Sequence, residues 1–346
     1  MATGPVYIVT GGAGFIGANL VAALVKREPD AHVVVIDDFR TGSYANLVEA
    51  FAREGLAPFS GSVTPQGVAD LDWDQAVEAL EPRAVFHLGA ITDTLEFDER
   101  VMLRANTEPW VEIISACIAT ETPLVYASSG ATYGSPKQGE DRVPFPVEAA
   151  GFPNNVYGFS KWLMDAEVFR LFREREEAGT ALPHIVGLRY FNVFGPGEAR
   201  KGKMASMAYH LTQQMLRGER PRIFKHGEHA RDQVFVADVV SCTLAAAGLG
   251  EKSDPTPGVY NTGSGQTTTF NQIVESINEA LGTSLEPEYI DMPEAMVPTY
   301  QHYTCADIGA TTAALGWSPN HDPCEATRAY AALLRDEAAK SAPLRA

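Results

Sequence analysis

The sequence has few cysteines and no long apolar run. Only four cysteines occur in 346 residues, Cys117, Cys242, Cys305 and Cys324, and no two of them form a CxxC spacing. This scatter argues against a disulfide framework and a zinc site, and it predicts reduced thiols and no bound metal. No segment approaches the roughly 20 apolar residues of a membrane helix, so we expect no membrane span.

Positive charge is also scarce. The chain has 27 Lys and Arg against 44 Asp and Glu, a formal net charge of −17. Such a balance argues against a nucleic-acid surface, because a phosphate backbone requires clustered cations. The N-terminus lacks the cationic and apolar segments of a signal peptide, since residues 6–10 run directly into a glycine turn. We therefore expect a cytoplasmic protein.

The first half of the chain alternates short β-branched runs with longer helical patterns. The strand candidates are residues 6–10, 33–37, 84–87, 124–128 and 184–189. This alternation predicts an α/β protein with a parallel, doubly wound sheet of the Rossmann type. Beyond about residue 190 the alternation loosens. In that part residues 250–258 are typical of a surface loop, and residues 270–282 have helical periodicity.

The change of pattern near residue 190 predicts two domains. We expect a dinucleotide-binding domain over residues 1–189, to which residues 233–263 return. Residues 190–232 and 264–341 are expected to form a smaller, mixed substrate-binding domain. Residues 342–346 are predicted to be a frayed tail, as chain ends often are.

A glycine turn after the first predicted strand indicates a dinucleotide site. Gly11, Gly14 and Gly17, with Phe15 and Ile16 between the last two, form GxxGxxG at the start of a predicted helix. Glycine permits the tight turn and the close approach of backbone N–H groups to a pyrophosphate, which the helix N-terminus also attracts.

An acidic residue follows this turn at the spacing of a ribose ligand. Asp37 lies 20 residues after Gly17 at the end of the next predicted strand, where it can accept hydrogen bonds from an adenosine ribose. Asp37 and the adjacent Asp38 should repel the 2′-phosphate of NADP, whereas Arg40 could pair with it, so the choice between NAD and NADP stays open. The remaining predicted cofactor-binding positions are Leu88, Gly89, Ala90, Asn106, Lys161 and Val193, and Asn106 could equally be a buried core amide.

Three residues predict hydride-transfer chemistry. Tyr157 and Lys161 form YxxxK on one face of a predicted helix, and Ser129 ends a predicted strand. A neighbouring ammonium and an oxidised nicotinamide favour the phenolate and should lower the tyrosine pKa from its ordinary value near ~10. The serine hydroxyl can then hydrogen-bond the reacting oxygen.

With these motifs the chain resembles an extended short-chain dehydrogenase/reductase, the superfamily of nucleotide-sugar epimerases and dehydratases. Dehydratases of that superfamily carry an Asp-Glu pair just after the catalytic hydroxyl residue. This chain has Gly130 and Ala131 there, which disfavours a dehydratase and favours an epimerase that oxidises a sugar carbon and reduces it again.

Three segments narrow the resemblance. Residues 131–134, 201–211 and 300–307 resemble the ADP-L-glycero-D-manno-heptose 6-epimerases, which invert C6 of an ADP-linked heptose for lipopolysaccharide assembly. The resemblance implies Tyr157 as catalytic base, Lys161 as its partner and Lys201 as a second acid/base. It also implies NADP as a tightly bound cofactor and a homo-oligomer, for which it suggests a pentamer. The substrate-binding positions that it implies are Asn192, Lys203, His210, Phe224, Arg231 and Tyr300.

The chain departs from that family at two positions. Tyr44 replaces a lysine expected after the second strand, and Lys203 replaces a serine. The first departure weakens the case for NADP, and the second affects the expected sugar contacts. A UDP-sugar 4-epimerase, acting for example on UDP-glucuronate or UDP-glucose, is the alternative enzyme. A non-catalytic dinucleotide sensor is a further alternative, although a sensor would not need Ser129, Tyr157 and Lys161.

Overall fold

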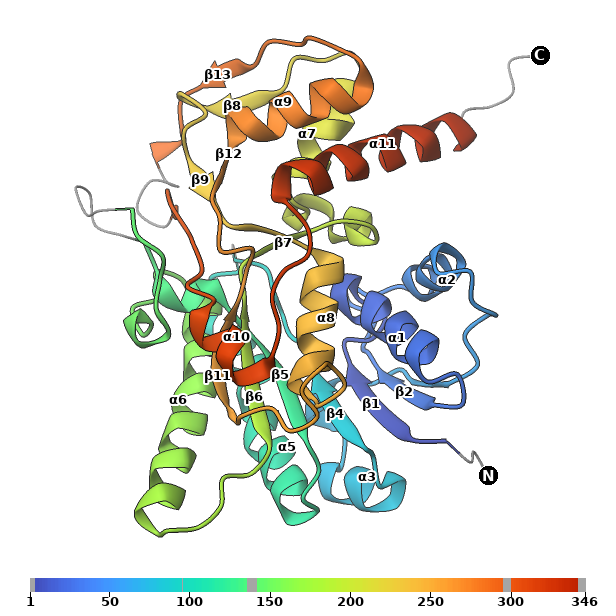
Figure 1. Cartoon of the computed structure of the whole chain (residues 1–346), viewed down its shortest axis with the longest axis vertical. Helices are drawn as coiled ribbons and strands as arrows, with labels where there is room; N and C mark the ends of the chain where they lie inside the picture. The colour runs from blue at the N-terminus through green and yellow to red at the C-terminus, as the bar shows by residue number, and fades with distance from the viewer. Residues whose placement is uncertain (1–3, 95, 136–141, 295–299, 342–346) are drawn as a thin grey trace.

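The computed structural model describes residues 4–94, 96–135, 142–294 and 300–341, and it is built on one seven-stranded parallel sheet (Figure 1). The sheet runs in the order β11-β6-β5-β4-β1-β2-β3. This order reverses direction between β1 and β4, as in Rossmann sheets, and it confirms the predicted fold class. The strands are β1 (Val6–Thr10), β2 (His32–Ile36), β3 (Ser62–Thr64), β4 (Ala84–His87), β5 (Leu124–Ser129), β6 (Ile185–Tyr190) and β11 (Gly258–Thr262).

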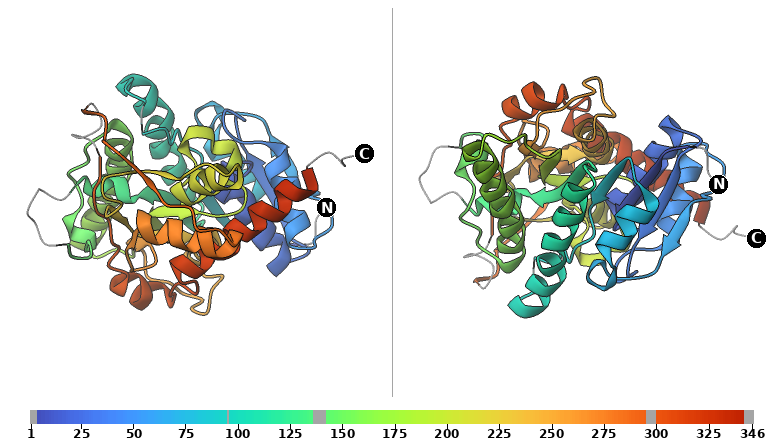
Figure 2. Two further views of the ribbon diagram at one scale, coloured as in Figure 1. Left: turned by 90° about the horizontal axis from the view of Figure 1, so that it is seen from above. Right: turned by 90° about the horizontal axis from the view of Figure 1, so that it is seen from below.

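Helices cover both faces of the sheet, which explains why its central strands are apolar on both sides. Figure 2, which views the chain from above and below, shows these helical layers. One layer comprises α1 (Phe15–Arg27), α2 (Tyr44–Arg53), α8 (Val236–Ala246) and α10 (Gly309–Leu315). The other comprises α3 (Trp73–Leu80), α5 (Glu108–Ala119) and α6 (Val156–Glu177), and α4 (Glu99–Asn106) contacts both α5 and α6.

A smaller lobe lies above the carboxyl ends of the sheet strands in the view of Figure 1. Its core is formed by α7 (Met207–Leu216), α9 (Phe270–Leu281) and α11 (Pro323–Ser341), which pack on one another. Short strand pairs complete it: β7 (Asn192–Phe194) with β10 (Gln233–Phe235), β8 (Arg222–Phe224) with β13 (Glu288–Ile290), and β9 (Ala230–Arg231) with β12 (Thr268–Thr269).

The chain crosses between the two lobes more than once. After the first part of the smaller lobe it returns as α8, which packs on α1, and as β11, which pairs with β6. Later α10 packs on α8 and β11. The second part of the expected substrate-binding segment thus also contributes to the core of the sheet lobe, and the division into two domains stays a proposal. The expected frayed tail, residues 342–346, lies outside the described residues.

The five expected strands all occur, with shifts of one residue at three of them. β3 and β11 were not expected, and the loop expected at 250–258 ends where β11 begins. The expected helix at 270–282 is α9, which starts with a capping box formed by Thr269 and Gln272 and ends at Gly282, whose φ is 65°. No helix in the described ranges is long and apolar enough to cross a membrane.

Candidate active site

A cavity of about 1390 Å³ opens at the carboxyl ends of the sheet strands, between the two lobes. Its walls come from the glycine turn, the loops after β2, β4 and β5, the start of α6 and residues 190–207. Ligands bind at this edge in doubly wound sheets, because the strand order reverses there and leaves a crevice. The cavity is therefore the candidate site.

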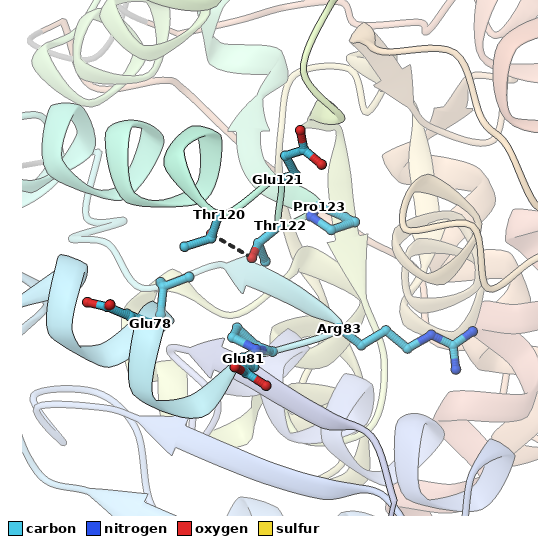
Figure 3. A pocket seen from close by; sticks show the side chains of 9 residues that line it. Glu78, Glu81, Arg83, Thr120, Glu121, Thr122 and Pro123 are labelled. Carbon is cyan, nitrogen blue, oxygen red and sulfur yellow. Dashed lines mark hydrogen bonds between the residues drawn. The ribbon is translucent and has the colours of Figure 1, made fainter.

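A second hollow, of about 510 Å³, lies at the opposite edge, where β4 and β5 begin (Figure 3). Glu78, Glu81 and Glu121 surround it, and Arg83 points away and pairs with Glu28 at 2.8 Å. Three carboxylates without a facing cation do not suit an anionic nucleotide, so this hollow is not a second candidate for one.

The glycine turn is shaped for a phosphate group. Gly11 has a φ of 65°, and a Cβ there would lie 2.8 Å from the backbone nitrogen of Gly89. A side chain at Gly17 would collide with the Gly11 carbonyl. Helix α1 begins after Gly14 without a side-chain cap, and all three glycines line the cavity. The unpaired N–H groups and partial positive charge of the helix N-terminus fit the pyrophosphate of a dinucleotide.

Asp37 lies just past β2 and is fixed by the backbone. Its Oδ2 accepts from the Ala13 N–H and its Oδ1 from the Phe39 N–H, both at 2.9 Å. Burial raises the pKa of Asp37, and the two N–H donors oppose that shift. The carboxylate lines the cavity and keeps lone pairs for a ribose hydroxyl.

The residues near Asp37 set the charge around the 2′-position of that ribose. Asp38 and Arg40 also line the cavity, and they pair with each other at 3.2 Å. Tyr44 is 74% exposed and is not among the lining residues. With Arg40 already paired, the three charged groups Asp37, Asp38 and Arg40 leave this end of the cavity with a net negative charge.

The loop after β4 forms another wall of the cavity. Leu88, Gly89 and Ala90 line the cavity, and the Gly89 N–H donates to the Thr10 hydroxyl at 2.9 Å. Asn106 does not line it.

Asn106 instead ties structural elements together. Its side chain exchanges hydrogen bonds with the Ile91 backbone at 2.8 and 3.0 Å and donates to the Ser160 hydroxyl at 3.0 Å. This geometry matches the alternative of a buried core amide, which holds the β4 loop against α6.

The expected catalytic residues meet in the cavity. Ser129, Tyr157 and Lys161 all line it, and a side-chain hydrogen bond joins the first two. The chain's own residues do not lower the tyrosine pKa as expected: burial raises the pKa of Tyr157, and the bond from Ser129 only opposes that shift. Burial lowers the pKa of Lys161 to about 8, against the opposing charge of Asp165. Its ammonium donates to the Met164 sulfur at 3.8 Å, a weak acceptor, which leaves donors for a bound ligand.

A buried polar network supports this helix. Asp165 lies one turn after Lys161 and is fully buried. It accepts hydrogen bonds from the hydroxyls of Tyr126 and Ser128 on β5 and pairs with the buried Arg189 on β6 at 2.8 Å. The network fixes α6, and with it Tyr157 and Lys161, to the two strands that border the cavity.

Lys201 faces the glycine-turn side of the cavity. It belongs to the 3₁₀ segment η4 (Glu198–Met204), lines the cavity and places its Nζ 5.5 Å from the ring centroid of Phe15. Burial lowers its pKa, and the charge of Glu198 opposes that shift. A lysine in this place can exchange a proton with a ligand or bind a phosphate.

Lys203 joins two walls of the cavity. It lines the cavity and pairs at 3.0 Å with Asp93, which follows the Leu88–Ala90 loop. Sequence reasoning missed Asp93, although its position shortly after β4 on the ligand edge of the sheet was an available signal.

The smaller lobe contributes a buried arginine. Arg231 is 8% exposed and lines the cavity, and its buried Nη1 has no hydrogen-bond partner among the residues that the structure describes. It stacks on Tyr300 at 4.8 Å, and Phe224 meets the same ring edge-on at 5.6 Å. An unpaired buried guanidinium donor is costly, so this place fits an anionic group of a ligand with an aromatic ring system beside it.

Three expected binding residues remain, and two of them line the cavity. Asn192 lines it and accepts a hydrogen bond from the Thr304 hydroxyl at 3.2 Å, and Val193 lines it as well. His210, on α7, is half-buried against Tyr209 and is not among the lining residues. The expected set is thus gathered in one cavity with the exceptions of Asn106 and His210.

A Rossmann sheet with a phosphate-binding glycine turn and a Ser-Tyr-Lys set at its carboxyl edge defines an extended short-chain dehydrogenase/reductase. Residues 7–263 match the NAD dependent epimerase/dehydratase family, and the chain belongs to that family.

Characterised relatives point to one kind of reaction. The chain is 36% identical to the ADP-L-glycero-D-manno-heptose-6-epimerase of Brachyspira hyodysenteriae over 310 residues, covering 89% of this chain and 91% of the relative. The Helicobacter pylori ADP-L-glycero-D-manno-heptose-6-epimerase has 30% identity and a TM-score of 0.78, with 94% of each chain covered. The UDP-glucose 4-epimerase of Thermotoga maritima has 26% identity and a TM-score of 0.79, with 96% and 99% covered. The chain is a nucleotide-sugar epimerase.

Proposed function

We propose that the chain epimerises ADP-glycero-manno-heptose at C6, as a step of lipopolysaccharide sugar supply. The observation that carries this proposal is the identity to two heptose 6-epimerases, 36% and 30%, together with Lys201 and Tyr157 lining one cavity. The UDP-glucose 4-epimerase is less similar in sequence, at 26% identity, although its TM-score of 0.79 is no lower than the 0.78 of the heptose epimerase. Fold alone therefore does not separate the two substrates, and the sequence favours the heptose.

The proposed roles follow from the geometry. The Tyr157 phenolate takes the proton of the C6 hydroxyl, Ser129 holds the reacting oxygen, and Lys161 stabilises the phenolate by its charge. A bound nicotinamide supplies reversible hydride acceptance. C6 lies outside the sugar ring, so rotation about the C5–C6 bond turns the other face of the resulting ketone toward the same hydride. The carbonyl oxygen moves in that rotation, and Lys201, which lines the same cavity, protonates it in the second orientation.

The remaining lining residues are proposed to hold the nucleotide sugar. Arg231 supplies its Nη1, which has no partner within the described ranges, to the diphosphate, and Tyr300 and Phe224 border the nucleoside end. Asn192 and Lys203 border the sugar.

The substrate assignment is tested by incubating the purified chain with ADP-heptose and with UDP-sugars and following stereochemistry by NMR. We expect inversion at C6 of the ADP-heptose and none at C4 of UDP-glucose or UDP-glucuronate. Faster inversion of a UDP-sugar would assign the chain to the 4-epimerases. Dinucleotide binding without turnover of any of these sugars would support a sensor.

The cofactor is proposed to be held through the whole cycle, because an epimerase must return the hydride that it removes. The family description is NAD dependent, whereas the heptose resemblance implies NADP. We expect the purified chain to retain a dinucleotide, which mild denaturation releases for identification by absorbance and mass. A chain isolated without dinucleotide and unable to bind either form would contradict this.

Titration of the dinucleotide-free chain should show weak discrimination between the two cofactors. The 2′-phosphate of NADP meets Asp37, Asp38 and an Arg40 that is already paired, and Tyr44 offers no compensating charge. Binding of NADP more than about a hundredfold tighter than NAD, roughly 2.8 kcal/mol, would overturn this. The matched variant Tyr44→Lys should improve NADP binding by about tenfold and leave NAD binding unchanged.

A further inference from the structure

Glu198 is a buried carboxylate for which the proposed mechanism has no role so far. It has no solvent exposure and opens the η4 segment. Its Oε1 accepts from the Gly195 N–H at 3.1 Å and from the Ser206 hydroxyl at 2.9 Å, and its Oε2 accepts from the Ser206 N–H at 2.6 Å. A side-chain hydrogen bond also joins it to Tyr330. Burial raises the pKa of Glu198, and the hydrogen bonds from Ser206 and Gly195 oppose that shift because they favour the ionised carboxylate.

These contacts hold both ends of the segment that carries Lys201. Gly195, Gly197 and Gly202 have φ angles of 135°, 101° and 56°, which regular helices and strands do not use. The path of residues 195–206 is thus set by contacts rather than by a regular ladder. Glu198 joins its beginning at Gly195 to its end at Ser206, where α7 starts.

Glu198 also acts on Lys201 by its charge. The two residues are three positions apart, and the carboxylate raises the lysine pKa against the larger, lowering effect of burial. Lys201 also lies over the Phe15 ring, with its Nζ 5.5 Å from the ring centroid. A nearby carboxylate and an aromatic face each favour the ammonium over the neutral amine.

The surroundings of Glu198 come from three other elements. Its titratable neighbours are Tyr209 on α7 and Tyr330 on α11, and the next groups outward are Glu337 on α11 and Arg53 on α2. Burial and the nearby carboxylates raise the pKa of Tyr330 far above its ordinary value, so its hydroxyl stays a donor. The C-terminal helix thereby contributes to the active-site segment.

We propose that Glu198 is a positioning residue of the epimerase: its carboxylate fixes the Lys201 segment at both ends and places a negative charge three positions from Lys201, with Tyr330 of α11 as its anchor. This inference rests on the proposed role of Lys201 as second acid/base. It assigns a function in catalysis to a group that does not touch the cavity.

The first test measures the pKa of Lys201 by NMR, independently of turnover. Lysines of the holoenzyme are labelled by reductive ¹³C-methylation, the Lys201 signal is identified by its loss in Lys201→Met, and its titration is followed by NMR. Glu198→Gln should lower the Lys201 pKa by about one unit, because a nearby opposite charge is lost. Asp238→Asn is the matched control, since Asp238 is another buried carboxylate that accepts the backbone N–H groups of Asn320 and His321, at 3.0 and 3.1 Å.

The second test measures kinetics on the same variants. Glu198→Gln should lower kcat by about 10- to 100-fold through misplacement of Lys201, with KM within about threefold of the parent. The limb of the kcat–pH profile that Lys201→Met removes should move to lower pH in Glu198→Gln and stay in place in Asp238→Asn. If Glu198→Gln does not fold, Tyr330→Phe replaces it in the test, because this variant removes the hydroxyl that anchors Glu198. It too should lower kcat rather than raise KM.

A Lys201 titration and pH limb that are the same in Glu198→Gln as in the parent would overturn the proposal and leave Glu198 a purely structural group. If only Tyr330→Phe is obtained, a parent-like kcat overturns it. Full activity of Lys201→Met is a different result: it would overturn the second acid/base role, while the NMR titration would still report whether Glu198 controls Lys201.

Discussion

Replacement of Tyr157 by phenylalanine should lower turnover by about 10²–10⁴-fold without unfolding the protein. The phenolic hydroxyl is the only group removed, and it is the group hydrogen-bonded to Ser129 in the cavity. The ring remains, so packing of α6 is kept. Steady-state rates of C6 inversion and the midpoint of thermal unfolding, measured on the same preparation, check both halves of this expectation.

A second tyrosine offers a control for this substitution. The Tyr260 hydroxyl is bound by the Thr256 and Pro257 carbonyls, at 3.0 and 3.3 Å, away from the lining residues. Tyr260→Phe should therefore leave turnover near that of the parent. Activity of Tyr157→Phe within about threefold of the parent would remove Tyr157 from the mechanism, because a general base contributes far more.

Replacement of Lys201 by methionine should block full epimerisation while leaving one half-reaction measurable. Methionine keeps the length and apolar contact with Phe15 but cannot transfer a proton. With a stereochemically defined substrate, reduction of the bound nicotinamide can be followed by absorbance in single turnover, and inversion by NMR. We expect the first signal for the epimer whose hydroxyl faces Tyr157, and a loss of inversion of about 10²-fold or more.

The alternative for Lys201 is an anion clamp, since it lies beside the first residue of α1. A clamp changes binding, so its loss should raise KM and be overcome by saturating substrate. Lys203→Met is the matched control, because Lys203 lines the same cavity on the same segment and pairs with Asp93. If Lys201→Met interconverts both epimers at the parent rate once saturated, the second acid/base assignment is wrong.

The sequence was most informative where a motif and its context agreed. Gly11, Gly14 and Gly17 could be assigned to a strand–turn–helix because the turn itself requires glycine, and YxxxK could be placed on one helix face from spacing alone. The strands β3 and β11 were missed because their local sequence patterns are weak. β3 is three residues long with one apolar side chain, and β11 ends in Asn261 and Thr262 after a Pro- and Ser-containing segment. Their pairing is decided by neighbours distant in sequence.

Long-range contacts also limited the prediction of the site. Asn106 had the sequence position of a ligand, but its amide satisfies Ile91 and Ser160. The contacts of Glu198 with Tyr330 and of Asp93 with Lys203 could not be predicted, because the fold brings together residues that are distant in sequence. The pKa of Tyr157 was expected to fall because of Lys161 and an oxidised nicotinamide, yet among the chain's own residues burial raises it and only the hydrogen bond with Ser129 opposes that shift. Burial of a single side chain depends on the whole packing, which local patterns do not report.

The late arrival of β11 has a consequence for how the chain is made. All six residues of β6 are buried, and β11 pairs along its outer edge from Gly258 to Thr262. During synthesis that edge stays without its partner strand until residue 262 has left the ribosome. An unpaired apolar edge is prone to join other chains. A chain truncated near residue 190 keeps that edge unpaired, so it should yield aggregate rather than a separate dinucleotide-binding protein.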